Sequence, residues 1–256
     1  MSNQDEIFWD KVKLGNNNYF NRYSGDTPAR SNDDYWNGDI PWLSNSEVED
    51  DKINLIQNTK ENITEEGYEN CTAKIVPKNS VILSCTASIG KVAINQQDMA
   101  TNQQFNAFEI RKQFNNYFLA NQFLYRKDEL EAIGGATTHN HLPVYMLEKF
   151  DVNKPSLKEQ QKIASVFYNL DQAIQKTQEI IKQTKRVKKG LMQDLLTKGI
   201  EHNEFKKVRI GAKKVAIPKK WKIHKLEEVT DRMKVGIASS VTQHYREEGI
   251  PLIRNL

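Results

Sequence analysis

Apolar residues recur at two different spacings along the chain, and the spacing changes near residue 155. Before that point, short β-rich runs such as 74–85 and 91–94 are separated by Pro, Gly, Asn and Ser, which favours strands and turns. A predicted helix at 115–133 interrupts them, and Gly134 and Gly135 follow as its expected stop. This pattern predicts an α+β globular target domain at residues 1–153.

After Pro155 the pattern becomes that of one long helix, expected over 154–200. Ser156 and Glu159 have the spacing of a capping box, and Gly199 is placed to end the helix. Apolar positions alternate steps of four and three, which predicts the seam of a coiled coil. About 40 residues rising ~1.5 Å each give a rod of about 60 Å, and such a rod must bury its seam against another long helix. The seam positions are Ile163, Phe167, Leu170, Ile174, Thr177, Ile181, Thr184, Val187, Leu191 and Leu195.

Two distant segments share a sequence pattern. Residues 35–45, YWNGDIPWLSN, align without a gap to residues 245–255, YREEGIPLIRN. Trp9, Lys13 and Leu14 align to Trp221, Lys225 and Leu226 at an offset that differs by two residues. The chain therefore reads as one repeat unit, a basic linker at 201–220, and the start of a second unit at 221–256.

Charge is distributed unevenly. The chain carries a net +4, but the stretch from Lys182 to Lys225 contains fifteen Lys/Arg and three Asp/Glu, a local +12 that leaves −8 for the rest. Such a segment suits a polyanion such as DNA, although a solvated helix face and linker have the same composition.

The start of the chain is polar and acidic, and no run reaches the roughly 18 apolar residues of a membrane span. We therefore expect a cytoplasmic protein without membrane contact. In that compartment Cys71 and Cys85 are expected to be reduced, structural thiols.

Motifs of catalysis are missing or incomplete. Two adjacent prolines, Gly-x-Gly and Pro-Asp do not occur, which removes the usual signatures of amino methyltransferases, nucleotide cofactor binding and nucleases. The stretch from Ser84 to Val92 is spaced like a phosphate loop, but Cys85 and Val92 replace its first glycine and its magnesium-binding hydroxyl. We expect no catalytic site and no cofactor.

The sequence gives little indication of a metal site. His139 and His141 have no cysteine or carboxylate at ligand spacing, so a polar loop is favoured over a metal site. The carboxylates at 33–34 and 49–51 lie in polar turns and are expected to be solvated. We therefore expect no metal.

Polar residues in predicted turns suit recognition better, because they are the donor and acceptor types that read base edges or hold phosphates. Each alone is also an ordinary turn residue. Trp36, Trp42 and Phe105 have the chemistry to stack on bases, but their apolar neighbours favour a place in the core. The candidate DNA-binding residues are Arg30, Ser44, Asn45, Lys91, Asn102, Gln103, Gln104, Thr137, Thr138 and His139.

The chain resembles the specificity (S) subunit of Type I restriction-modification enzymes across nearly its whole length. The resemblance rests on five stretches in the expected order. These are SGDTPARSNDDYWNGDIPWLSNSEV (24–48), ITEEGYENCTAKIVPKNSVILSCTASIGKVAI (63–94), ATNQQFNAF (100–108), KPSLKEQQKIASVFYNLDQAI (154–174) and KKGLMQDLLTKGI (188–200).

The resemblance implies two recognition domains that each read one half of an interrupted DNA target, and two long helices that pair antiparallel and fix the gap between the halves. It places methylation and cleavage in separate modification and restriction subunits, with S-adenosylmethionine bound by the modification subunit. The implied partners are double-stranded DNA, modification subunits and, indirectly, restriction subunits.

The departure from the family is that the sequence stops at Leu256, before most of a second recognition domain. We therefore expect a half-length, non-catalytic subunit that dimerises with a second copy through Ile163, Phe167, Leu170, Ile174, Ile181, Leu191 and Leu195. Two alternatives remain. One is a truncated interaction protein that binds modification subunits through its helix without reading DNA, and the other is an enzyme with an unrecognised site.

Overall fold

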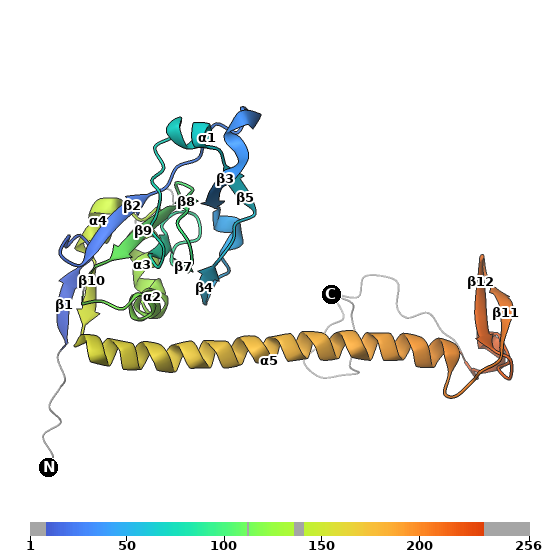
Figure 1. The fold of residues 1–256 in the computed structure, drawn as a ribbon. Helices are drawn as coiled ribbons and strands as arrows, with labels where there is room; N and C mark the ends of the chain where they lie inside the picture. The colour runs from blue at the N-terminus through green and yellow to red at the C-terminus, as the bar shows by residue number, and fades with distance from the viewer. Residues whose placement is uncertain (1–8, 112, 136–140, 233–256) are drawn as a thin grey trace, which may run out of the picture. The chain divides into compact units, whose positions relative to one another are not determined.

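The computed structural model describes residues 9–111, 113–135 and 141–232 (Figure 1). It confirms the predicted α+β domain followed by a long helix. The chain divides into two compact units, residues 1–178 and 179–256, which are described separately.

A five-stranded sheet with the order β2-β9-β6-β7-β4 forms the centre of the first unit. Neighbouring strands are antiparallel, except that β4 runs parallel to β7. Every residue of β6 and β7 is buried, which explains why these two strands read as short continuous apolar runs. The strands are β2 (Phe20–Ser24), β9 (Phe105–Ile110), β6 (Val81–Ser84), β7 (Val92–Asn95) and β4 (Ile53–Ile56).

A second sheet has the order β5-β3-β8. Its central strand β3 (Trp36–Leu43) is antiparallel to β5 (Glu61–Ile63) and parallel to β8 (Ala100–Thr101). The short helices η1 (Asp33–Tyr35) and η2 (Asn45–Glu47) flank β3, and α1 (Glu65–Glu69) follows β5. The beginning and end of the domain are joined by a third, two-stranded pairing of β1 (Asp10–Lys13) with β10 (Asp151–Lys154).

The predicted helix at 115–133 is two helices, α2 (Asn116–Tyr125) and α3 (Lys127–Gly135). The chain leaves α-helical geometry at Arg126, whose guanidinium donates to the Asp151 carbonyl and to Glu129. The same guanidinium lies 4.0 Å from the ring centre of Phe150. These contacts give the break a tertiary cause that no local breaker residue signals.

The largest apolar cluster packs α2 and the five-stranded sheet together, with Phe20, Phe108 and Phe123 among its fully buried members. The last helix of the domain, α4 (Val144–Lys149), contributes the buried Leu147 to the same cluster. This core makes the five-stranded sheet and its helices a rigid base for the turns at the strand ends.

The long helix α5 (Leu157–Lys198) is shorter than the expected range 154–200, because Lys154 belongs to β10, and it lies between the predicted cap at Ser156 and the predicted stop at Gly199. The Ser156 hydroxyl accepts from the Glu159 amide at 3.3 Å. At the other end, Gly199 takes a φ of +69° and its amide donates to the Leu195 carbonyl.

Three side chains fasten the first turns of α5 to the domain. Gln160 is fully buried; its side chain accepts from the Asn115 amide at 2.9 Å and donates to the carbonyls of Gln113 and Pro155. Further along, the Tyr117 hydroxyl donates to Asp171, and its ring meets Tyr168 edge-on. The Gln160 side chain alone makes three hydrogen bonds to the domain and the preceding turn, so this joint fixes the first turns of α5 against the domain.

Residues 201–220, expected to be a linker, contain a two-stranded antiparallel hairpin. Its strands are β11 (Phe205–Ile210) and β12 (Lys213–Pro218), and Gly211 at the turn has a φ of +60°. The segment contains a strand pattern, because Val208, Val215 and Ile217 alternate with basic residues at every second position. The high charge of the segment hides this pattern in the sequence.

The expected start of a second repeat is described only in part. Trp221 meets the His202 ring edge-on, and Leu226 begins the short helix η3 (Leu226–Glu228), whereas its counterpart Leu14 is buried beside β1. Residues 245–255, which carry the aligned pattern, lie outside the described residues. Along the described ranges, no helix combines the length and apolarity needed to cross a bilayer.

Candidate nucleic-acid interface

Six of the ten candidate residues come together at one edge of the three-stranded sheet. Strands β3 and β8 are parallel neighbours with Leu43 opposite Thr101, so the turns that follow both strands leave at the same edge. The Asn102 amide donates to the Leu43 carbonyl at 3.0 Å and ties the two turns together. We call this set the turn cluster: Ser44, Asn45, Lys91, Asn102, Gln103 and Gln104.

The two asparagines of the turn cluster are largely buried, each 8% exposed. The side chain of Asn102 donates to Gln104 Oε1 at 3.0 Å and accepts from the Gln104 amide at 3.1 Å, which closes the turn. Asn45 Oδ1 is buried with no hydrogen-bond partner among the described residues. Both side chains therefore shape the turns from inside.

The outward-facing members are Gln103, Gln104 and Lys91. Gln103 is exposed, and its amide oxygen accepts from the Thr27 hydroxyl. The half-buried Lys91 ammonium lies 3.5 Å from the Asn45 carbonyl oxygen. Two primary amides and an ammonium on a rigid edge can offer donors to base edges and phosphates.

Ser44 has a structural role as well. Its amide donates to Glu47 Oε1 at 3.2 Å, and its hydroxyl lies 2.8 Å from the Ser46 hydroxyl. The bond between the Ser44 amide and Glu47 belongs to the capping box of η2. Ser44 therefore stabilises the turn that carries Asn45.

Arg30 lies apart from the turn cluster, in a stack with the two tryptophans. Its guanidinium forms a two-pronged ion pair with Glu61 and lies 3.7 Å from the ring centre of Trp36 and 5.0 Å from that of Trp42. The hydrogen bonds from Arg30 lower the pKa of Glu61. The pair is partly exposed, so a phosphate can compete with Glu61 for the guanidinium.

Two of the three candidate stacking aromatics belong to the core, as the sequence favoured. Trp42 is 2% exposed and donates its indole N–H to the Asp26 carbonyl, and Phe105 is 1% exposed. Trp36 is half-buried beneath Arg30.

Thr137, Thr138 and His139 lie outside the described residues. The chain resumes at His141, whose Nδ1 lies 2.8 Å from the Thr86 hydroxyl. Next to it, the Leu142 amide donates to the Cys85 carbonyl, and the Cys85 amide donates to the Gln104 carbonyl. Residue 142 is thus joined to the turn cluster through one intervening strand end.

The acidic turn at 49–51 is paired where the sequence suggested solvated carboxylates. The Lys127 ammonium lies 2.6 Å from Asp50 and 3.0 Å from Asp51. Its hydrogen bonds lower the pKa of Asp50. No short-range sequence signal links these positions, because 76 residues separate Lys127 from Asp51.

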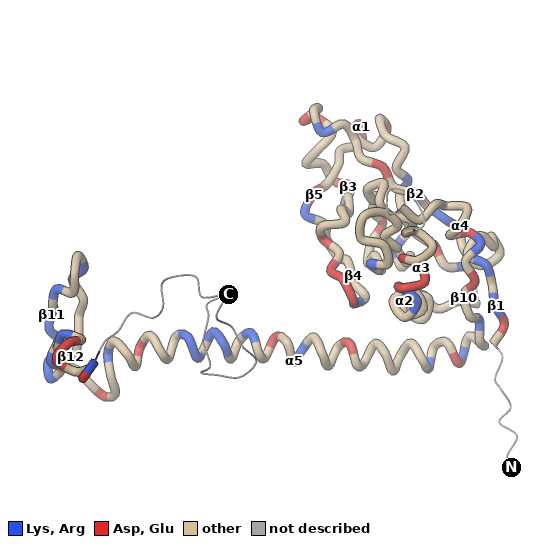
Figure 2. Tube along the Cα trace, turned by 180° about the vertical axis from the view of Figure 1, so that it is seen from behind, with Lys and Arg blue, Asp and Glu red and all other residues tan. Residues whose placement is uncertain are grey.

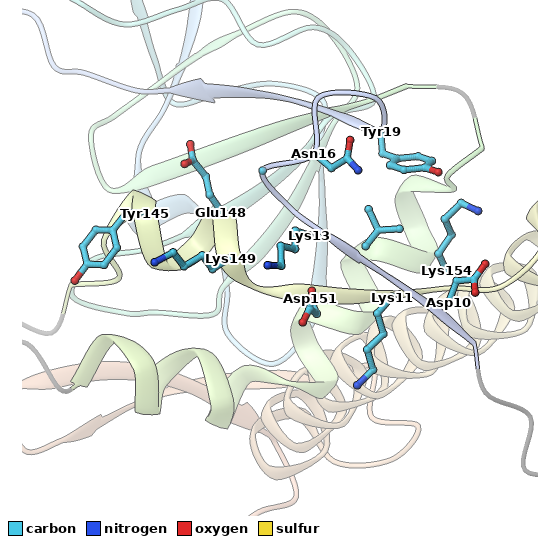
Figure 3. Close-up of a pocket in the computed structure, with 12 residues that line it drawn as sticks. Asp10, Lys11, Lys13, Asn16, Tyr19, Tyr145, Glu148, Lys149, Asp151 and Lys154 are labelled. Atoms are coloured by element: carbon cyan, nitrogen blue, oxygen red, sulfur yellow. The ribbon is translucent and has the colours of Figure 1, made fainter.

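Among the described residues no group of three His, Cys, Asp or Glu side chains could hold a metal ion. A depression of about 790 Å³ lies along β1 and β10 (Figure 3). Its lining mixes cations and carboxylates, among them Lys11, Lys13, Asp10 and Asp151. Small-molecule sites are mostly apolar and enclosed, so this open, charged surface does not indicate one.

Comparison with known proteins gives a consistent result. Residues 9–186 match the family described as "Type I restriction modification DNA specificity domain". The MjaIX specificity subunit of Methanocaldococcus jannaschii is 29% identical over 238 residues, which cover 90% of this chain and 54% of that protein. The HindI specificity subunit of Haemophilus influenzae is 29% identical over 154 residues, covering 56% of this chain and 32% of that protein. The chain thus spans about half the length of the first of these curated relatives.

Solved structures share the fold. The HsdS subunit of Thermoanaerobacter tengcongensis aligns with a TM-score of 0.52 at 15% identity, over 73% of this chain and 44% of that one. The S subunit of M. genitalium aligns with a TM-score of 0.51 at 13% identity, over 76% of this chain and 47% of that one.

Proposed function

The chain belongs to the family of type I restriction-modification DNA specificity domains, and from this premise we propose that it reads one half of an interrupted DNA target without catalysing a reaction itself. The observation that carries the proposal is the turn cluster. It sets Lys91, Gln103 and Gln104 on one rigid sheet edge. Primary amides suit base edges, and lysine suits phosphates.

We propose that the chain acts as an antiparallel dimer through α5. The seam side chains Phe167, Leu170, Ile174, Ile181, Leu191 and Leu195 are 43% to 55% exposed, and Ile163 packs partly against the domain core. A heptad seam of this length is an association surface, and α5 is the only helix of such length among the described residues. A second copy offers an identical seam and covers it.

Docking of modification subunits is the third part of the proposal. The curated relatives are specificity subunits of type I restriction enzymes, and methyl transfer requires a partner that binds S-adenosylmethionine. The paired helices provide a rod on which such a partner can bind. The alternative, an interaction protein that docks without reading DNA, draws support from the same exposed seam.

Methylation profiling tests the proposal. A host without other type I systems would express the chain with its modification subunit, and modified bases would be mapped across the genome. The expected result is one half-site repeated in inverted orientation around a fixed gap, because a two-fold protein reads a two-fold target. Gln103→Ala should change or abolish the half-site and leave the gap unchanged.

Gln57→Ala is the matched control, because Gln57 is an exposed glutamine of the same unit outside the turn cluster. An asymmetric motif would overturn the dimer of identical chains. Loss of all sequence-dependent methylation, with the modification subunit still bound, would instead establish the interaction protein.

A further inference from the structure

The β11–β12 hairpin carries three cations on one face, and among the described residues the hydrogen bond that they make is the one from Arg209 Nε to the Gly211 carbonyl at 3.2 Å, within the hairpin turn. Residues directly opposite each other in the hairpin share a face, and Lys207 faces Ala216 while Arg209 faces Lys214. These three cations are exposed, and Figure 2 shows the Lys and Arg positions in blue along the hairpin. The other face holds Val208, Val215 and the buried Ile217. That face also carries Lys206 and Lys213, so the two faces differ in that one joins lysines to a cluster of aliphatic side chains and the other, the cationic face, gathers Lys207, Arg209 and Lys214.

The cationic face is unfavourable as it stands. Arg209 and Lys214 are cross-strand partners, and like charges in that position repel. Among the described residues no carboxylate forms an ion pair with Lys207, Arg209 or Lys214. The nearest acidic residue in sequence, Glu204, is paired with Lys219 at 3.1 Å. An external anion would relieve the repulsion.

We propose that this face, Lys207, Arg209 and Lys214, binds the phosphate backbone of double-stranded DNA without reading sequence. Same-face residues on a strand lie roughly 6.8 Å apart, and the phosphates of one DNA strand rise about 3.4 Å each. Because each strand also winds around the axis, neighbouring phosphates lie farther apart than this rise, and Lys207 and Arg209 are spaced to contact neighbouring phosphates of one strand. The inference rests on the proposed function, because it supplies phosphate contacts to a domain whose turn cluster has few cations.

A protein partner fits this face less well. The centres of protein interfaces are depleted in lysine and use buried aromatic and aliphatic anchors. The middle of the cationic face offers only Ala216 as an apolar contact. The cationic face therefore suits the phosphates of DNA better than the apolar centre of a protein interface.

The test compares two variants of the full chain that lose the same charge from the same strands. Lys207→Gln with Lys214→Gln removes two lysines from the cationic face. Lys206→Gln with Lys213→Gln removes two from the opposite face. Fluorescence anisotropy would measure affinity for a duplex carrying the profiled target and for a scrambled duplex, from low to moderate salt, and circular dichroism would verify the fold.

The first variant should reduce the slope of log affinity against log salt by about 1.8, or about 0.9 for each lost phosphate contact. It should weaken binding to both duplexes by the same factor, and the second variant should have little effect. Equal effects of the two variants, or none, would overturn the proposal. An unchanged slope with loss of modification-subunit binding would overturn it in favour of a protein partner. A wild-type chain that binds both duplexes equally would contradict the proposed recognition function and leave the slope comparison valid.

Discussion

Single side chains in the turn cluster divide between those that build the turns and those that face outward. Asn45 and Asn102 are buried, and Asn102 uses its amide to close the turn through Gln104. Gln103 and Lys91 keep polar groups near the surface. A substitution of Asn102 would therefore act through turn geometry, whereas a substitution of Gln103 would act at the surface itself.

Cys85 offers a residue-scale test of the core. It is completely buried, and burial raises its pKa to about 11. Alkylation requires the thiolate, which forms only as the pH approaches the raised pKa, so at pH 8 the folded protein should protect Cys85. Iodoacetamide labelling of a Cys71→Ser variant, followed by peptide mass spectrometry, should modify Cys85 only when denaturant unfolds the domain.

The rate of labelling should increase steeply through the unfolding transition measured by circular dichroism. Serine at position 71 leaves Cys85 as the only cysteine of the chain, so every labelled thiol is that of Cys85. Labelling of the native protein at the rate of an exposed cysteine would contradict the burial of Cys85 directly after β6.

Sequence predicts residue type well at this scale and residue orientation poorly. The sequence placed these amides in or beside turns, and it contains no signal for the parallel pairing of β3 and β8 that brings the two turns to one edge. Whether an amide points inward depends on the register of the turn, which long-range bonds such as that from the Asn102 amide to the Leu43 carbonyl decide. The bond between Arg30 and Glu61 has the same long-range origin.

At the scale of elements, α5 changes from buried to exposed along its length. Gln160 and Ala164 face the domain and are buried. Beyond this joint, Leu170 and Ile174 are 53% and 55% exposed. Burial of an exposed half of such a side chain contributes about 1 kcal/mol, so a seam of several residues in each of two copies can offset the entropy cost of association.

Replacement of Leu170 and Ile174 by Asp should therefore break the dimer without unfolding the domain. An unpaired buried carboxylate costs several kcal/mol, whereas both positions face solvent in the isolated chain. Sedimentation at micromolar concentration should show a dimer for the wild type and a monomer for the variant. Lys176→Glu, at an exposed position of the same helix outside the seam, is the control because it also changes the charge by −2. A wild-type monomer at high concentration would refute seam pairing.

Elements with strong local signals were predictable, and those with tertiary causes were not. The cap at Ser156, the stop at Gly199 and the heptad spacing specify α5 from its own sequence. The break at Arg126 depends on Asp151 and Phe150, which no window around residue 126 contains. The hairpin at 205–218 was concealed because its basic residues resemble those of a solvated linker.

For the whole molecule, identical copies on a two-fold axis impose symmetry on any DNA they read together. The turn clusters would set the half-site, while α5 and its fixed joint at Gln160 and Tyr117 would set the gap. In this proposal the two properties belong to different parts of the chain, so they should change independently.

Deletion of one heptad, residues 178–184, tests this separation. Removing seven residues keeps the seam in phase and shortens the helix by roughly 10 Å at 1.5 Å per residue, which is about three base pairs at 3.4 Å each. Methylation profiling should therefore return the wild-type half-sites with a gap about three base pairs shorter. Replacing residues 178–184 by another heptad of the same apolar pattern is the matched control and should keep the wild-type gap, because length and phase are both preserved. A deletion variant that methylates the original spacing would show that the helix does not set the distance, and altered half-sites would show that the recognition domain is not independent of it.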